Sequence, residues 1–95
     1  MHAVIRTYSG KGAKELFEIL EKHTSDVEKL LRSVKGFVGY SLVRTADGGF
    51  SVSICKDKAG TDESIQKARD WIKQNASSAG TGAPAVTEGT AILHI

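Results

Sequence analysis

β-forming residues open the chain, and apolar residues then recur at helical spacing. Residues 2–8, HAVIRTY, are rich in β-forming side chains and end at Ser9-Gly10-Lys11-Gly12, which predicts a first strand. The apolar positions that follow at helical spacing are Ala13, Leu16, Phe17, Leu20, Val27, Leu31 and Val34. They predict one long amphipathic helix that ends at Gly36, because glycine is favoured just past a helix C-terminus.

A hairpin is predicted in the middle of the chain. Two β-rich runs, residues 37–45 and 50–57, flank Ala46-Asp47-Gly48-Gly49. An Asp-Gly pair between such runs favours a two-residue turn, because that turn needs positive φ angles. With Asp-Gly as the turn, the expected cross-strand pairs are Ala46–Gly49, Arg44–Ser51, Leu42–Ser53 and Tyr40–Cys55.

The C-terminal half is predicted to form a second helix, a loop and a last strand. Thr61 is suited to cap the helix, because a hydroxyl there can accept from free backbone N–H groups. The expected inward face of that helix carries Ile65, Ala68 and Ile72, with Trp71 on its flank. Residues 77–84 are small and polar and predict a loop, and residues 85–95 predict the last strand.

The predicted order is β-α-β-β-α-β, which is the ferredoxin-like α+β plan. In this plan a four-stranded antiparallel sheet carries two helices on one face. Because no internal repeat or second domain is evident, we expect a single domain over residues 1–95.

The RNA-recognition module has the same element order, and residues 35–43, KGFVGYSLV, look like its strand motif. That motif needs aromatic residues two apart, so that both rings share one sheet face and stack on bases. Phe37 and Tyr40 are three apart and are therefore expected on opposite faces. The sequence favours a chance likeness.

Composition narrows the class of protein further. Of 95 residues, 40% are hydrophobic and 25% are charged, which is ordinary for a globular protein. The net charge of +2 gives no electrostatic reason to expect a nucleic-acid or membrane partner. No signal-peptide core or membrane span is apparent, so we expect a cytoplasmic protein.

Three stretches together resemble a known family: VKGFVGYSLVR at 34–44, SVSICKDK at 51–58 and AGTDESIQKARDWIKQN at 59–75. Their order, and the G-F-x-G-Y stretch, are similar to the dimeric α/β-barrel superfamily and within it to small proteins of the antibiotic biosynthesis monooxygenase type. The resemblance implies a homodimer in which two sheets face each other to form a barrel. In enzymatic members it also implies a pocket for aromatic or polycyclic substrates between the sheet and the helices.

The resemblance distinguishes two chemistries. Haem-degrading members use an Asn–Trp–His trio, but the second half of this chain offers only His94 as a histidine. Members that oxidise quinols without a cofactor use Asn, Trp, Tyr and Arg to bind the substrate and stabilise its anion. Since the chain has several of these residue types, we expect no metal or other cofactor.

Strand alternation suggests where a polar pocket could lie. One face of the predicted hairpin carries Tyr40, Arg44, Ser51, Ser53 and Cys55. The other face carries Phe37, Val43, Phe50, Val52 and Ile54, which are typical of packing. On the first strand, Val4, Arg6 and Tyr8 share one side.

The first functional hypothesis is a cofactor-independent monooxygenase acting on a small aromatic substrate. In it Arg44 or Arg6 stabilises a substrate oxyanion, Tyr40 and Trp71 position the ring, and His23 is the base. Tyr8 and Cys55 complete the predicted pocket.

Structural roles are open for several of these residues. No sequence feature ties a histidine to Cys55, so a small buried filler suits it. His23 lies at the edge of the apolar stripe, where a half-buried side chain is ordinary. Trp71, Tyr8 and Tyr40 could instead belong to the core edge or a dimer interface.

The second hypothesis is a non-catalytic dimeric module that binds a ligand or responds to stress. A closed pocket in which Tyr40, Arg44 and His23 converge favours the enzyme. A sheet without a pocket, with Arg44 paired to the partner subunit, favours the module.

Overall fold

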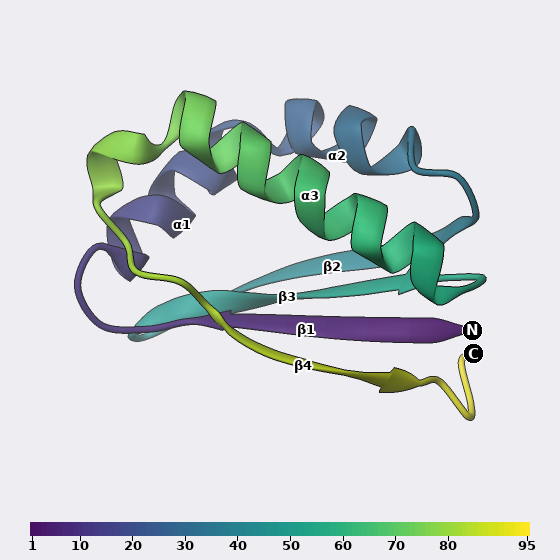
Figure 1. The fold of residues 1–95 in the computed structure, drawn as a ribbon. Coiled ribbons are helices and arrows are strands. Elements are labelled where there is room, and N and C mark those ends of the chain that lie inside the picture. Colours follow the sequence, from purple (N-terminus) through teal and green to yellow (C-terminus); the bar gives the residue numbers. More distant parts are fainter.

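The computed structural model describes residues 1–95 and has a four-stranded sheet with every helix on one side (Figure 1). The elements are β1 (His2–Tyr8), α1 (Ala13–Lys22), α2 (Thr24–Arg32), β2 (Phe37–Thr45), β3 (Gly48–Cys55), α3 (Lys58–Asn75), a 3-10 turn η1 (Ser77–Ala79) and β4 (Ala85–Thr90). The strand order is β2-β3-β1-β4 with all neighbours antiparallel. This confirms the expected ferredoxin-like α+β fold.

The first helical segment is two helices rather than the single long helix expected. His23 leaves the helical conformation at φ −123° and ψ 29°, so α1 ends there and α2 begins at the next residue. Thr24, Ser25 and Asp26 follow the break. Their side chains compete for backbone hydrogen bonds and so favour helix starts over helix interiors. The apolar period continues across the break, which explains why it predicted one helix.

The hairpin register differs by two residues from the expected one. Thr45 pairs with Gly48, so Ala46 and Asp47 form the turn. A turn centred on Asp-Gly needs positive φ at both residues, but here Gly48 alone is positive, at 156°. The observed pairs are Arg44–Gly49, Leu42–Ser51 and Tyr40–Ser53. A two-residue shift leaves every side chain on its expected face, because the side-chain period of a strand is two.

Phe37 lies on a different face from the one predicted. The pairing of β2 with β3 shifts between Phe37 and Gly39, which is a β-bulge. A bulge adds one residue to a strand and reverses the alternation beyond it. Phe37 therefore packs against the same core as Tyr40, on the helix side. The prediction that the two rings point to opposite faces was wrong.

Two element ends also differ from expectation. Helix α3 begins one turn before Thr61, because the carboxylate of Asp57 accepts a hydrogen bond from the backbone N–H of Gly60 at 3.1 Å. The last strand ends at Thr90 instead of continuing through residues 91–95. Beyond it the backbone N–H of Ala91 still donates to the carbonyl of Met1, at 2.9 Å.

The core lies between the helices and the sheet. Its buried cluster consists of Tyr8, Ala13, Leu16, Phe17, Leu20, Val27, Leu31, Ala76 and Ala79. Strand β3 contributes polar residues to this side, since Ser51 and Ser53 are buried while Phe50 and Val52 lie on the opposite face and are partly exposed. Strand β3 thus presents two serines to the core and apolar side chains to the outside.

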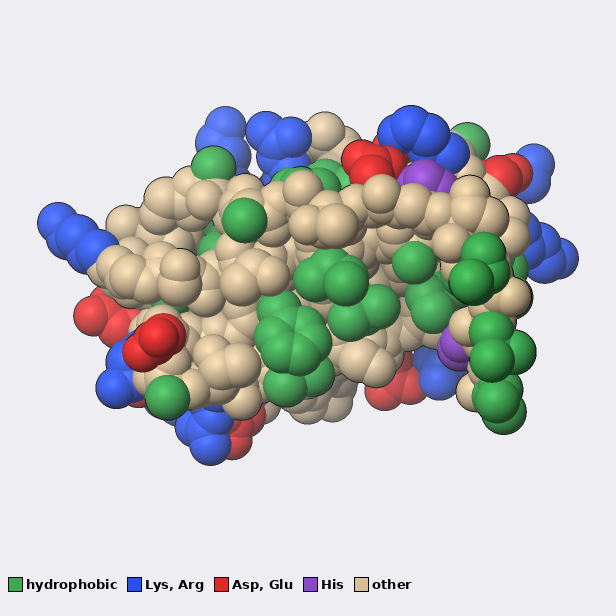
Figure 2. All heavy atoms as spheres, turned by 90° about the horizontal axis from the view of Figure 1, so that it is seen from below, with side chains coloured by type: hydrophobic (Ala, Val, Ile, Leu, Met, Phe, Trp, Pro, Cys, Tyr) green, Lys and Arg blue, Asp and Glu red, His purple; other side chains and the backbone are tan.

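The opposite face of the sheet has no helix over it and shows a group of apolar side chains near its centre (Figures 1 and 2). Ile5 on β1 is 39% exposed and Val43 on β2 is 37% exposed. Clustered exposed apolar side chains of this kind mark interaction surfaces. We call this surface the open face. None of the helices is both long enough and apolar enough to pass through a membrane.

Replacing Gly49 with alanine is expected to destabilise the fold. A Cβ there would lie 2.3 Å from a ring carbon of Phe17 and 2.4 Å from the carbonyl oxygen of Val43. Overpacking of this kind costs about 1–3 kcal/mol. Gly89→Ala is the matched control, because that strand glycine has nothing within 4 Å of its added Cβ. Urea unfolding at one protein concentration compares the two, and equal midpoints would contradict the packing argument.

Candidate functional site

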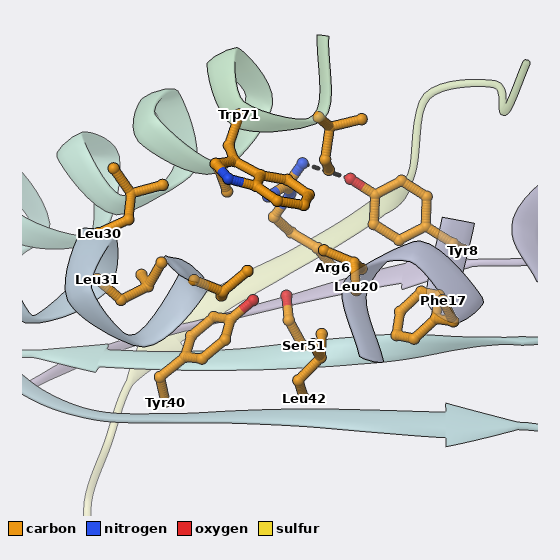
Figure 3. Close-up of a pocket in the computed structure, with 13 residues that line it drawn as sticks. Arg6, Tyr8, Phe17, Leu20, Leu30, Leu31, Tyr40, Leu42, Ser51 and Trp71 are labelled. Carbon is orange, nitrogen blue, oxygen red and sulfur yellow. Dashed lines mark hydrogen bonds between the residues drawn. The ribbon is translucent and has the colours of Figure 1, made fainter. Parts of the chain in front are cut away.

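A small cavity lies between the sheet and the helices (Figure 3). Most of its wall is apolar, from residues of α1, α2 and α3, with Trp71 of α3 over it. Its polar groups come from Arg6, Tyr8, Tyr40 and Ser51 on three strands. The cavity measures about 20 Å³, which is room for about one water molecule. We call it the inner cavity.

Arg6 is the most unusual residue of the inner cavity. Alternation along β1 directs Arg6 and Tyr8 toward the helices, where Arg6 is only 4% exposed. Its guanidinium donates a hydrogen bond to the Tyr8 hydroxyl and lies 5.5 Å from the centre of that ring. It makes no ion pair. A buried charge without a counter-charge is costly, which makes Arg6 the leading candidate for a functional residue in this cavity.

The two tyrosines of the site are held in the neutral form. Burial raises the pKa of Tyr8 above its ordinary value of 10.0, although the charges of Arg6 and Arg69 act in the opposite direction. Burial likewise raises the pKa of Tyr40, opposed by the Ser51 hydroxyl and by Arg6. The hydroxyls of Tyr40 and Ser51 point toward one another in Figure 3. Neutral phenols can donate hydrogen bonds to an anion.

Trp71 forms part of the cavity wall, and His23 lies behind it, outside the cavity. The Trp71 ring lines the inner cavity. Its edge meets the His23 ring, with centres 5.7 Å apart and planes inclined by 63°. His23 sits at the break between α1 and α2, is exposed, and lies 3.5 Å from a carboxylate oxygen of Asp26. His23 therefore contacts the cavity only through Trp71, and its predicted role as a base stays a prediction.

Arg44 and Cys55 do not line the inner cavity. Arg44 is exposed near the hairpin turn and forms an ion pair with Glu21 of the same chain, at 3.2 Å. Cys55 is fully buried at the far end of β3. Burial is the main cause that raises the pKa of its thiol, with the charge of Asp57 adding to it, which disfavours the reactive thiolate. The structure thus brings together Arg6, Tyr8, Tyr40 and Trp71, but not Arg44, Cys55 or His23.

Two larger depressions adjoin the inner cavity. The edge groove, about 430 Å³, lies between α2 and β2 and shares Tyr40 and Leu42 with it. The outer cleft, about 550 Å³, lies between α3, β4 and the loop at residues 80–84, and shares Arg6 and Tyr8 with it. Both volumes fall in the range of about 300–1,000 Å³ that is typical of small-molecule sites.

Two cations of the outer cleft, Arg69 and Lys73, were not predicted from the sequence. The sequence feature that could have indicated them is their spacing of four residues, which places both side chains on one side of α3. Sequence could not show that this side meets the loop before β4, because that contact joins distant parts of the chain.

No protein-family model matches the sequence, and no curated protein sequence is similar to it. Solved structures do match. SnoaB, a cofactor-independent oxygenase from Streptomyces nogalater, is 15% identical, with 99% of this chain and 95% of that chain covered and a TM-score of 0.65. A monooxygenase from Streptomyces coelicolor, from the gene ActVA-Orf6 and in complex with nanaomycin D, is 19% identical, with coverages of 99% and 88% and a TM-score of 0.63.

A dimeric ferredoxin-like protein from an uncultured marine organism is 11% identical, with coverages of 99% and 94% and a TM-score of 0.65. Identities this low show a shared fold and leave function open. The chain therefore shares the ferredoxin-like fold of these structures, which is the fold that the order of its predicted elements implied.

Both tyrosines are expected to ionise only above pH 10.0, because burial raises both pKa values. A group that holds its proton more tightly when folded contributes stability below its unfolded pKa, and that stability is lost as the pH rises through the folded pKa. Ultraviolet absorbance titration measures the phenolates directly, since the chain has only these two tyrosines. Tyr8→Phe and Tyr40→Phe assign the two steps. A tyrosine that ionises at or below pH 10.0 would contradict the burial argument.

Proposed function

We propose that this protein binds a small aromatic ligand as its anion, and that the ligand is oxidised by molecular oxygen without a cofactor. The observation that carries the proposal is the buried, unpaired charge of Arg6 among neutral phenols and an indole ring. A guanidinium held away from water interacts strongly with an oxyanion placed beside it. We therefore assign to Arg6 the stabilisation of the oxyanion. Tyr40 and Trp71 are assigned the positioning of the aromatic ring.

The proposed reaction converts an activated CH₂ group of an anthrone-like substrate into a carbonyl. Loss of a proton gives an anion, which passes one electron to oxygen, and the resulting radical and superoxide join in a new C–O bond. The peroxide anion takes back the proton lost in the first step, and the hydroperoxide then loses water, which breaks the O–O bond and removes the second hydrogen from the carbon. Overall CH₂ and O₂ give C=O and H₂O, and the substrate supplies all four electrons. Arg6 promotes the first step because it stabilises the anion.

A binding protein without catalysis is the second candidate, and two observations favour it. The inner cavity holds about one water molecule, so an aromatic ring has room only if the cavity joins an adjoining depression. The predicted base, His23, also lies behind Trp71. For catalysis, the indole ring must move or water must accept the proton.

Arg6→Gln is expected to weaken binding of the anthrone anion about 10- to 100-fold, because a charge-assisted hydrogen bond is lost. Glutamine can still donate a hydrogen bond to Tyr8. Because the variant no longer buries a charge, its fold should be at least as stable as that of the wild type. Quenching of Trp71 fluorescence measures binding, since it is the only tryptophan. Lys29→Gln removes an exposed charge on α2 as the control. Equal affinities in all three proteins would refute the role of Arg6.

Oxygen uptake with anthrone separates the two candidate functions. Enzymatic oxidation is expected to consume oxygen and form anthraquinone faster than anthrone does alone, and Arg6→Gln should slow it. Arg6→Lys keeps the charge and should therefore retain part of the rate. Binding without any rate above the background would leave the non-catalytic protein.

We further propose that the protein is a homodimer whose two open faces pack together. Support comes from the apolar side chains that β1, β2 and β3 direct to this face, and from the dimeric state of a protein with the same fold. Ile5 is central to the proposed interface, because β1 is an inner strand and Val52 of β3 is its cross-strand neighbour. Burial of such a face stabilises a chain of this size.

Ile5→Lys is expected to produce a monomer, because the dimer would have to bury an unpaired ammonium group. Val86→Lys is the matched control, since Val86 is 50% exposed on a strand but pairs with Arg6 and so lies on the helix side. Sedimentation equilibrium measures the mass of both variants at one concentration. If the protein stays dimeric with Ile5→Lys but becomes monomeric with Val86→Lys, the interface does not lie on the open face.

A further inference from the structure

All of the charged residues that line the outer cleft are cations. Arg69 and Lys73 lie one turn apart on α3, and Arg6 contributes from β1. None of the residues that line the cleft is acidic. None of the three cations makes an ion pair, although Arg32, Arg44, Lys58 and Lys67 elsewhere all do. A hollow lined by one sign of charge attracts the opposite charge.

Arg6 connects the outer cleft with the inner cavity. It lines both, and it is more than nine-tenths buried. Burial raises the pKa of the neighbouring Tyr8 hydroxyl, while the charges of both Arg6 and Arg69 act to lower it. The two guanidinium groups therefore act on one place, from the sheet and from the helix.

The loop on the far side of the cleft adds hydrogen-bond donors. Gly12 packs against it so closely that a Cβ would lie 2.2 Å from the carbonyl oxygen of Ala79. The backbone N–H groups of Thr81, Gly82 and Ala83 donate no backbone hydrogen bond. Where such N–H groups face the cleft, their partner is water or an anion.

We propose that the outer cleft binds a carboxylate carried by the aromatic ligand, and that the ligand is therefore an aromatic carboxylic acid. This inference rests on the proposed function, because it extends the same ligand from the inner cavity into the cleft. The carboxylate lies between Arg69 and Lys73, and the ring system passes Arg6 toward Trp71. The forked donors of a guanidinium match a carboxylate in both charge and shape.

The test compares anthracene carboxylic acid with its primary amide, which has the same rings without the charge. The wild type is expected to bind the acid about tenfold more tightly at low ionic strength, and added sodium chloride should reduce this preference. Arg69→Gln and Lys73→Gln should each reduce the preference about two- to fivefold, because both charges are exposed. Lys67→Gln on the same helix is the control, since Lys67 pairs with Glu63 outside the cleft.

The outcomes separate this inference from the proposed function. If acid and amide bind equally well in the wild type, the carboxylate site is refuted while aromatic binding stands. If neither compound quenches Trp71, the carboxylate site is refuted, and the anthrone titration alone decides the proposed function, because an anthracene ring forms no oxyanion beside Arg6. Titration with inorganic phosphate, followed through the amide signals of Gly82 and Ala83, provides a further arm. Arg69→Gln could abolish phosphate binding while the wild type binds acid and amide equally well. That result would make the cleft a site for a free anion and would refute the proposal that it binds the carboxylate of the aromatic ligand.

Discussion

Side chains on a strand point alternately to the two faces of its sheet, and on β3 this alternation directs two serines inward and apolar residues outward. On β3, Ser51 and Ser53 lie under the helices while Val52 and Ile54 lie on the open face. The helices must therefore cover a partly polar layer, in which the inner cavity forms. The open face, in turn, leaves apolar area that one copy of the chain cannot bury.

The cost of burying Arg6 connects stability with function. A guanidinium removed from water and left without a carboxylate lowers stability, and proteins commonly accept such a cost at functional sites. Burial also keeps Tyr8 and Tyr40 neutral, so the site offers one cation and two hydroxyl donors. All three groups favour an anion over a neutral molecule.

The fold is shared with oxygenases and with a dimeric ferredoxin-like protein, yet low identity separates the chain from all of them. One fold commonly serves several functions, so the size and charge of the cavities carry the functional argument. The inner cavity alone is too small for a ring, whereas the outer cleft has the volume and charge for part of a ligand. Arg6 belongs to both.

The sequence by itself determined the order of the elements, the ferredoxin-like plan and the side of β1 that carries Arg6 and Tyr8, because these follow from local periods of two and 3.6 residues. Only the tertiary structure decided which polar residues meet. It pairs Arg44 with Glu21 and turns Phe37 inward through a bulge. Such contacts join distant segments, and their geometry depends on registers and helix breaks that shift by one or two residues without changing the hydrophobic pattern.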